Sequence, residues 1–158
     1  MPAGTAKKTS LPDPQHLFET RQLIELIQEG VWVIDPQGTT TYVNPRLAEM
    51  MGFAPAELIG QQLFAFLDEE AAGVCRTVLG DIRENKRRQI EGHLIGKGGR
   101  RVDVLISGSP LLNSHGEYEG AMALMTDISR MKQTEKYLNM LNELTANIYV
   151  VIDRGYRI

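Results

Sequence analysis

The sequence is poor in the residues that cross-link a protein, anchor it in a membrane or give it one strong charge. Its single cysteine, Cys75, excludes an internal disulfide and fits a reducing compartment. It has no run of ~18 apolar residues to cross a membrane, and residues 1–15 lack the apolar stretch of a signal peptide. The net charge of -3 argues against a broad nucleic-acid-binding surface. We therefore expect a cytoplasmic segment without nucleic-acid or membrane contact.

Motifs of catalysis and metal binding are also missing. The histidines His16, His93 and His115 are widely separated, and one cysteine cannot build a Cys/His zinc cluster. Neither Gly-x-Ser-x-Gly nor His-Glu-x-x-His occurs. The glycine-rich residues 96–99 join two expected strands and precede no helix, which favours a hairpin turn over a phosphate site. We predict no catalytic residue and no metal site, although an enzyme remains the competing class.

Apolar periodicity and turn residues divide the chain into helices and strands. We expect residues 1–13 to be disordered and 14–29 to form an amphipathic helix that ends at Gly30. Asn44 is the expected N-cap of a helix that has proline at its first position. Two strands, several helices and three further strands are the order of an α+β fold, an antiparallel sheet with helices on one side. The expected strands are 31–34, 39–43, 87–95, 100–111 and 118–126, and the expected helices are 46–51, 54–58, 62–67, 68–84 and a final one through residue 142.

Alternation along the strands indicates which face each side chain occupies. Ile90 and Leu94 share one face, whereas Glu91 and His93 share the other, so we expect His93 at the surface. Both faces of the sheet carry apolar residues, and both therefore need cover. Helices between the strands cover one face, and we expect the N-terminal helix or a partner molecule to cover the second. The apolar residues of the second face are Leu105, Met122 and Leu124.

The end of the chain repeats its first predicted strand. Glu143-Leu144 and Ile152-Asp153 reproduce the spacing of Glu25-Leu26 and Ile34-Asp35, and a glycine-containing turn follows in both places. Two unrelated strands of similar composition are the alternative. A repeat of this length indicates tandem domains. We predict that residues 143–158 are the first strand of a second, truncated domain in a longer protein.

Five short segments give the chain a resemblance to the PAS sensor family with its C-terminal PAC portion. They are GVWVID at 30–35, YVNP at 42–45, MGF at 51–53, ELIG at 57–60 and MTDIS at 125–129. The resemblance covers residues 16–128 and implies a five-stranded antiparallel sheet of order 2-1-5-4-3 that cups a pocket under the helices. Domains that resemble this one usually precede histidine kinase, diguanylate cyclase or phosphodiesterase output domains, mostly in bacteria. The resemblance divides the chain into a PAS/PAC domain at 30–128, flanked by an N-terminal helix at 14–29 and a signalling linker helix at 129–142.

The same resemblance implies an apolar pocket wall on the sheet. In the family, the residue before the strand aspartate faces the pocket, and the alternation described above carries this face across the sheet. Flavin-binding relatives use asparagine and glutamine at such sheet positions and an Asn-Cys-Arg-Phe core, of which only Cys75-Arg76 is present here. Haem relatives take a histidine from a region that has none here. No cofactor is therefore predicted, and Cys75 is expected to pack within its helix. The expected pocket residues are Trp32, Ile34, Leu94, Val104, Ile106, Gly108, Ala123 and Met125.

Two functional interpretations follow. In the first, the pocket is filled by its own side chains, and the module dimerises and relays a signal to an output domain in the same protein. In the second, the pocket holds a small apolar ligand of unknown identity. A homodimer through the N-terminal and linker helices serves both, since apolar residues recur at heptad spacing in the linker. The expected relay residues are Asp127, Ile128, Met131, Leu138 and Leu141.

Overall fold

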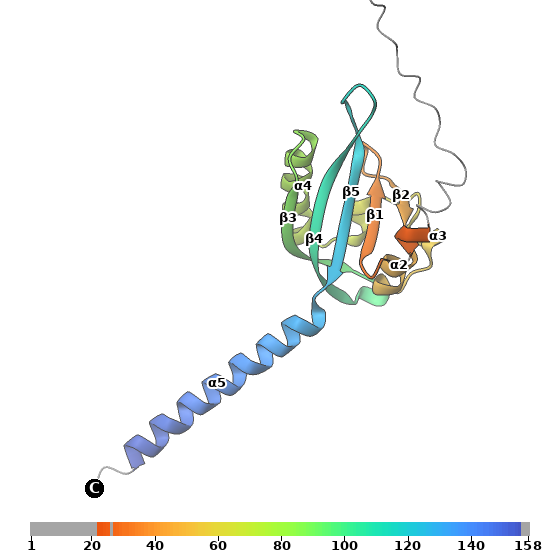
Figure 1. Cartoon of the computed structure of the whole chain (residues 1–158). Coiled ribbons are helices and arrows are strands. Elements are labelled where there is room, and N and C mark those ends of the chain that lie inside the picture. The colour runs from red at the N-terminus through yellow and green to blue at the C-terminus, as the bar shows by residue number, and fades with distance from the viewer. Residues whose placement is uncertain (1–21, 26, 156–158) are drawn as a thin grey trace, which may run out of the picture.

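The structure is a computed structural model that describes residues 22–25 and 27–155, with side chains through residue 146. Five strands form one antiparallel sheet in the order β2-β1-β5-β4-β3 (Figure 1). This is the α+β arrangement and strand order predicted from the sequence. The elements are β1 (Gly30–Ile34), β2 (Thr40–Val43), α2 (Pro45–Met51), α3 (Pro55–Leu58), the 3-10 turn η1 (Leu63–Phe66), α4 (Glu69–Arg83), β3 (Arg88–Ile95), the turn η2 (Lys97–Gly99), β4 (Arg101–Leu112), β5 (Tyr118–Asp127) and α5 (Ser129–Gly155).

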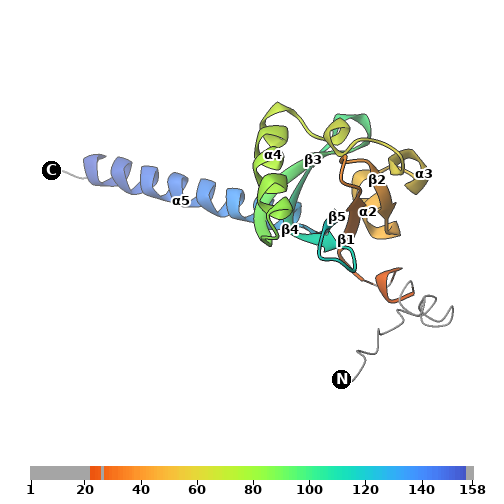
Figure 2. The ribbon, with the colours of Figure 1, turned by 90° about the horizontal axis from the view of Figure 1, so that it is seen from above.

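The helices between β2 and β3 lie on one side of the sheet, and α5 projects away from it (Figure 2). The core fills the space between this helical layer and the sheet. Leu47 and Met51 from α2 meet Trp32 from β1 and Val104 from β4, and all four side chains are buried. Burial of large apolar side chains is the main favourable term in folding. The helical layer and the sheet therefore stabilise each other.

The register of the sheet brings the predicted pocket residues together. Trp32 pairs with Ala123, Gly108 also pairs with Ala123, and Ile106 pairs with Met125. Residues directly opposite in an antiparallel sheet point to the same face. The inward face thus continues from β1 through β5 to β4, as alternation predicted.

Asn44 is the predicted N-cap, and the structure gives it a larger role. Its side chain is fully buried, and its Oδ1 accepts hydrogen bonds from the backbone N–H groups of Leu47 at 3.0 Å and Val31 at 2.8 Å. Its Nδ2 donates to the carbonyl oxygens of Glu29 at 3.0 Å and Ile24 at 3.3 Å. One amide therefore joins the start of α2 to β1 and to the segment that precedes the sheet.

The expected N-terminal helix at 14–29 agrees with the structure only in part. Residues 22–25 are helical, but 27–29 are not, and Gly30 begins β1. The carbonyl oxygen of Gln28 accepts from Arg46 Nε at 3.1 Å, and that of Glu29 accepts from Asn44. These carbonyl groups bind α2, so the chain leaves the helix before Gly30. Residues 14–21, and the disorder expected for 1–13, lie outside the described residues.

Helix α5 is longer than the predicted linker of 129–142. It continues to Gly155 through residues that were expected to form a strand. A strand needs a hydrogen-bonded neighbour, and no second strand accompanies this segment in the part of the chain that the structure describes, whereas a helix satisfies its backbone locally. The expected strand of 143–158 is therefore wrong for residues 143–155, and the start of a second domain stays a prediction.

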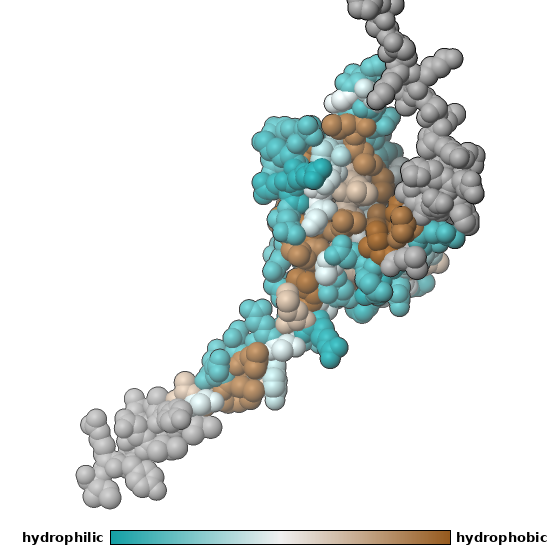
Figure 3. Space-filling view, viewed as in Figure 1, coloured by the Kyte–Doolittle hydropathy of each residue, from teal (hydrophilic) through white to brown (hydrophobic). Residues whose placement is uncertain are grey.

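The sheet face opposite the helical layer carries the apolar residues that alternation placed there. Leu105, Met122 and Leu124 each keep part of their surface exposed. Figure 3 shows apolar surface running over this face and on to α5. No described helix crosses the face (Figure 1). Within 22–25 and 27–155, no helix has the length and apolar character needed to cross a membrane.

Candidate functional site

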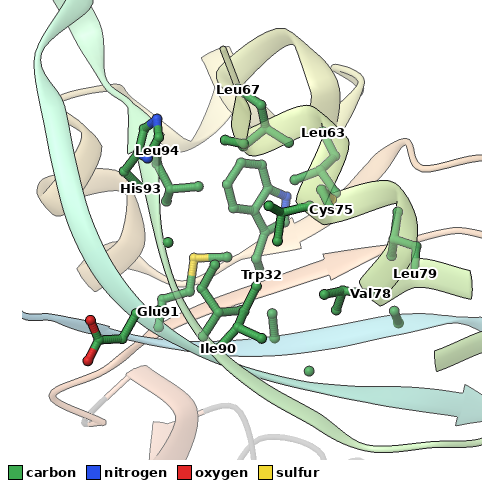
Figure 4. A pocket seen from close by; sticks show the side chains of 18 of the residues that line it. Trp32, Leu63, Leu67, Cys75, Val78, Leu79, Ile90, Glu91, His93 and Leu94 are labelled. Carbon is green, nitrogen blue, oxygen red and sulfur yellow. The ribbon is translucent and has the colours of Figure 1, made fainter. Parts of the chain in front are cut away.

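A cavity of about 370 Å³ lies between α4 and the inner face of the sheet. Trp32 stands at its centre, with Leu63 and Cys75 on the helical side and Ile90 and Leu94 on the strand side (Figure 4). This volume is within the range of small-molecule sites, roughly 300–1,000 Å³. Whether side chains fill this space or a small apolar ligand occupies it stays a prediction.

The sheet wall of the cavity includes most of the residues that the sequence predicted, together with others such as Ile90 and Ala121. Val104 is the exception, because it is completely buried in the core and does not line the cavity. The structure brings the other seven together at the cavity: Trp32, Ile34, Leu94, Ile106, Gly108, Ala123 and Met125.

The helical wall was missed by the sequence analysis. Within α4, Cys75, Val78, Leu79 and Ile82 recur at the three- and four-residue spacing of one helix face. That spacing was a usable signal, but it did not show which strand the face would meet. The helix face packs against β4 at Gly108, where the missing side chain leaves room for Ile82. A Cβ at this position would lie 2.7 Å from Ile82 Cδ1. The remaining apolar residues of this wall are Leu63, Leu67, Ala71 and Val74.

The buried polar groups around the cavity are already hydrogen-bonded within the protein. The Trp32 indole Nε1–H donates to Thr40 Oγ1 at 2.9 Å, and both residues are buried. Phe66 contacts Trp32 edge-to-face, with ring centroids 5.7 Å apart. Among the described residues, no buried side-chain nitrogen or oxygen lacks a hydrogen-bond partner. The cavity is therefore suited to an apolar occupant, because it has no unpaired group to satisfy.

His93 corrects a prediction. It was expected to be a surface residue, yet it is buried and its Nε2 lies 2.6 Å from Asp68 Oδ2. Asp68 caps α4, since its Oδ1 accepts from the Ala71 backbone N–H at 2.9 Å. This bond and the His93 contact lower the pKa of the Asp68 carboxyl. Alternation failed here because β3 is the edge strand, and the start of α4 closes over its free side.

Cys75 lines the cavity from α4 and also packs against the core, as expected for a helix packing residue. Burial raises the pKa of its thiol to about 11, although Arg76 opposes the shift. At neutral pH the group is a thiol and therefore a poor nucleophile. It shares the cavity wall with apolar side chains, so a reagent that modifies the thiol must reach the cavity.

The predicted relay residues fall into two groups. Asp127 and Ile128 form the junction, where Asp127 Oδ1 accepts from the Ser129 backbone N–H at 2.9 Å and Ile128 is buried. Met131, Leu138 and Leu141 lie farther along α5, where they are 57%, 54% and 39% exposed. The first group fixes the start of α5 to the sheet, whereas the second is free to contact another molecule.

The chain is similar in sequence to a known protein family and to a curated protein. Residues 28–130 match the PAS domain family. The signal transduction histidine-protein kinase AtoS of Escherichia coli (strain K12) is 30% identical over 135 residues. That match covers 82% of this chain but only 22% of the kinase. The chain therefore spans about a fifth of the length of this curated relative.

Solved structures show the same fold at lower identity. A PAS domain from Colwellia psychrerythraea superposes with a TM-score of 0.68 at 16% identity, covering 73% of this chain and 98% of that one. The PAS domain of an HTR-like protein from Haloarcula marismortui gives 0.61 at 22% identity, covering 72% and 93%. An RNA-binding light-oxygen-voltage receptor gives 0.67 at 17% identity, covering 94% and 43%. At these identities the likeness concerns the fold.

Proposed function

This chain belongs to the PAS domain family, and from that premise we propose that it is a sensory and dimerisation module whose signal leaves through α5. The observation that carries the proposal is the apolar side of α5. Its large apolar side chains are exposed, whereas most of those in the domain that precedes it are buried. Isolated helices gain little from exposed apolar residues, and a parallel partner helix would cover them. The exposed set is Met131, Tyr137, Leu138, Met140, Leu141 and Leu144.

The output domain belongs to the proposal as well. The curated relative is a histidine kinase of which this chain matches about a fifth. We infer that the module regulates an output domain in the same protein, with a histidine kinase favoured over the diguanylate cyclase alternative. Catalysis would then reside in that domain and not in these residues, and a cytoplasmic location fits this role.

The dimer is tested by placing charge on the apolar side of α5. We expect Leu138→Asp with Leu141→Asp to abolish self-association in sedimentation velocity, because two carboxylates would be buried in the contact. The matched control is Gln133→Asp with Asn139→Asp, which adds the same two charges at exposed positions of α5 that lie away from the heptad line of Met131, Leu138 and Leu141. The proposed dimer is wrong if both pairs behave alike, or if the unaltered chain is monomeric.

A small apolar ligand is the second candidate, and the open cavity favours it. Native mass spectrometry should then show a retained molecule that is lost on denaturation. Ala123 lines the cavity, so Ala123→Leu should fill part of it and reduce the retained fraction. Ala56→Leu, at an exposed position of α3, is the control. A retained mass that Ala123→Leu leaves unchanged would place the molecule elsewhere.

A further inference from the structure

Edge strand β3 is attached to two different helices by side chains two residues apart. His93 Nε2 lies 2.6 Å from Asp68 Oδ2 at the start of α4. Glu91 Oε2 lies 2.6 Å from Lys132 Nζ in the first turn of α5. Strand β3 pairs in the sheet only with β4. A strand with one hydrogen-bonded neighbour moves more readily than a central strand, so these two contacts add to its pairing with β4 in holding it in place.

Both contacts lie at the cavity. Glu91, His93 and Lys132 are among its lining residues, although its centre is apolar. Figure 4 shows the Glu91 carboxylate directed away from the apolar centre and His93 beside Leu94, farther along the strand. These polar side chains therefore form a rim where β3 faces α4 and α5.

The backbone adds a second connection to α5. Asp103 pairs with His93 across the β3–β4 ladder. The Ile128 N–H donates to the Asp103 carbonyl oxygen at 3.0 Å, and the Asp103 N–H donates to Ser129 Oγ at 3.2 Å. The start of α5 is thus hydrogen-bonded to the residue opposite the one that holds α4. A displacement of this part of the hairpin reaches both helices.

We infer that β3 couples the cavity to α5. The His93–Asp68 contact holds the gap between α4 and β3 closed, and the Glu91–Lys132 contact holds the first turn of α5 against the same strand. Widening the gap loosens the first turn of α5, and releasing that turn opens the gap. The inference rests on the proposed function only in treating α5 as the output element. His93 and Lys132 are positioning residues in this mechanism.

Coupling between two sites is reciprocal, so the inference can be tested in both directions. Cys75 is the single cysteine of the chain and lines the cavity. Glu91→Gln, on the side of α5, should raise the rate at which N-ethylmaleimide modifies Cys75 by about fivefold. Glu49→Gln is the matched control, because it also removes a carboxylate from an exposed ion pair, with Arg46 on α2.

The reverse direction uses Asp68→Asn, which keeps a good helix N-cap but removes the charge that faces His93. It should speed hydrogen exchange of the Lys132 amide, which donates to the Ile128 carbonyl oxygen, by about fivefold. The Asn44 amide, which donates to the Val31 carbonyl oxygen, should exchange at its original rate. An equal increase at Asn44 would mean general destabilisation and would overturn the inference.

The coupling is also wrong if each variant changes only its own side of β3. This result is separable from failure of the proposed function, because self-association through α5 is measured with different variants. A dimer that forms without coupling would leave the module as an assembly element. Coupling in a monomer would retain the relay within the domain and remove the parallel helix pair.

Discussion

Large apolar side chains are mostly buried in the domain from β1 to β5 but exposed on α5, the helix that follows it. In the domain, side chains such as Trp32, Leu47 and Leu94 are at most 2% exposed, whereas Leu138 and Leu144 on α5 are more than half exposed. The domain builds a buried core of its own, although Leu105, Met122 and Leu124 on its outer sheet face stay partly exposed. Helix α5 is attached at its first turn and has its apolar side open. The domain therefore has a core of its own, whereas the large apolar side chains of α5 stay exposed among the described residues.

Replacing Asn44 is expected to lower the free energy of unfolding more than the other changes predicted here. Asn44→Ala removes four hydrogen bonds from a fully buried position and leaves their backbone partners unpaired. We expect the free energy of unfolding to fall by about 3 kcal/mol. Urea denaturation followed by fluorescence of Trp32, the single tryptophan, measures it. Asn139→Ala on exposed α5 should cost less than about 0.5 kcal/mol. Similar losses in both variants would contradict the division drawn here.

A substitution at the contact between α4 and the sheet should lower the free energy of unfolding by a smaller amount. Gly108→Ala places a Cβ 2.7 Å from Ile82 Cδ1 and should lower the free energy of unfolding by about 1–2 kcal/mol. Ile82→Val removes that methyl group, so the double variant should lose less than the two single losses added together. The same denaturation assay serves. Additive losses would show that α4 does not press on β4 at this point.

Acid should weaken the attachment of α4 through Asp68, with the smallest effect of the three. The Ala71 N–H and His93 lower the pKa of this carboxyl in the folded state. The unfolded chain therefore binds the proton more tightly, and the added stability is present above the usual aspartate pKa of about 4 and is lost as pH falls through the folded value. Asp68→Asn should lower stability at pH 7, and the difference from the unaltered chain should shrink on acidification. A difference that is constant between pH 7 and pH 3 would contradict this assignment.

Local signals predicted the strands and helices of the domain because each has a distinct period and end. The turn at 35–38, the cap at Asn44 and the hairpin at 96–99 set boundaries that agree with the structure within one or two residues. Seven of eight predicted pocket residues line the cavity for the same reason, since a period of two fixes the face of a strand. The secondary-structure prediction was less accurate after the last strand of the domain. Residues 143–158 resemble β1, yet α5 runs to Gly155.

The sequence by itself determined the individual strands, the residues that share a face of each strand and the apolar residues of α5, because these follow from spacing along a single element. The strand order and the face that lines the pocket were what the resemblance to the PAS family implied. Only the tertiary structure decided how α4 sits on the sheet, since its apolar face could meet any strand until Gly108 and Ile82 set the distance. It also placed Asp68 beside His93, 25 residues away, and Lys132 beside Glu91. Contacts between distant elements depend on how those elements pack, and no periodicity within either element encodes them.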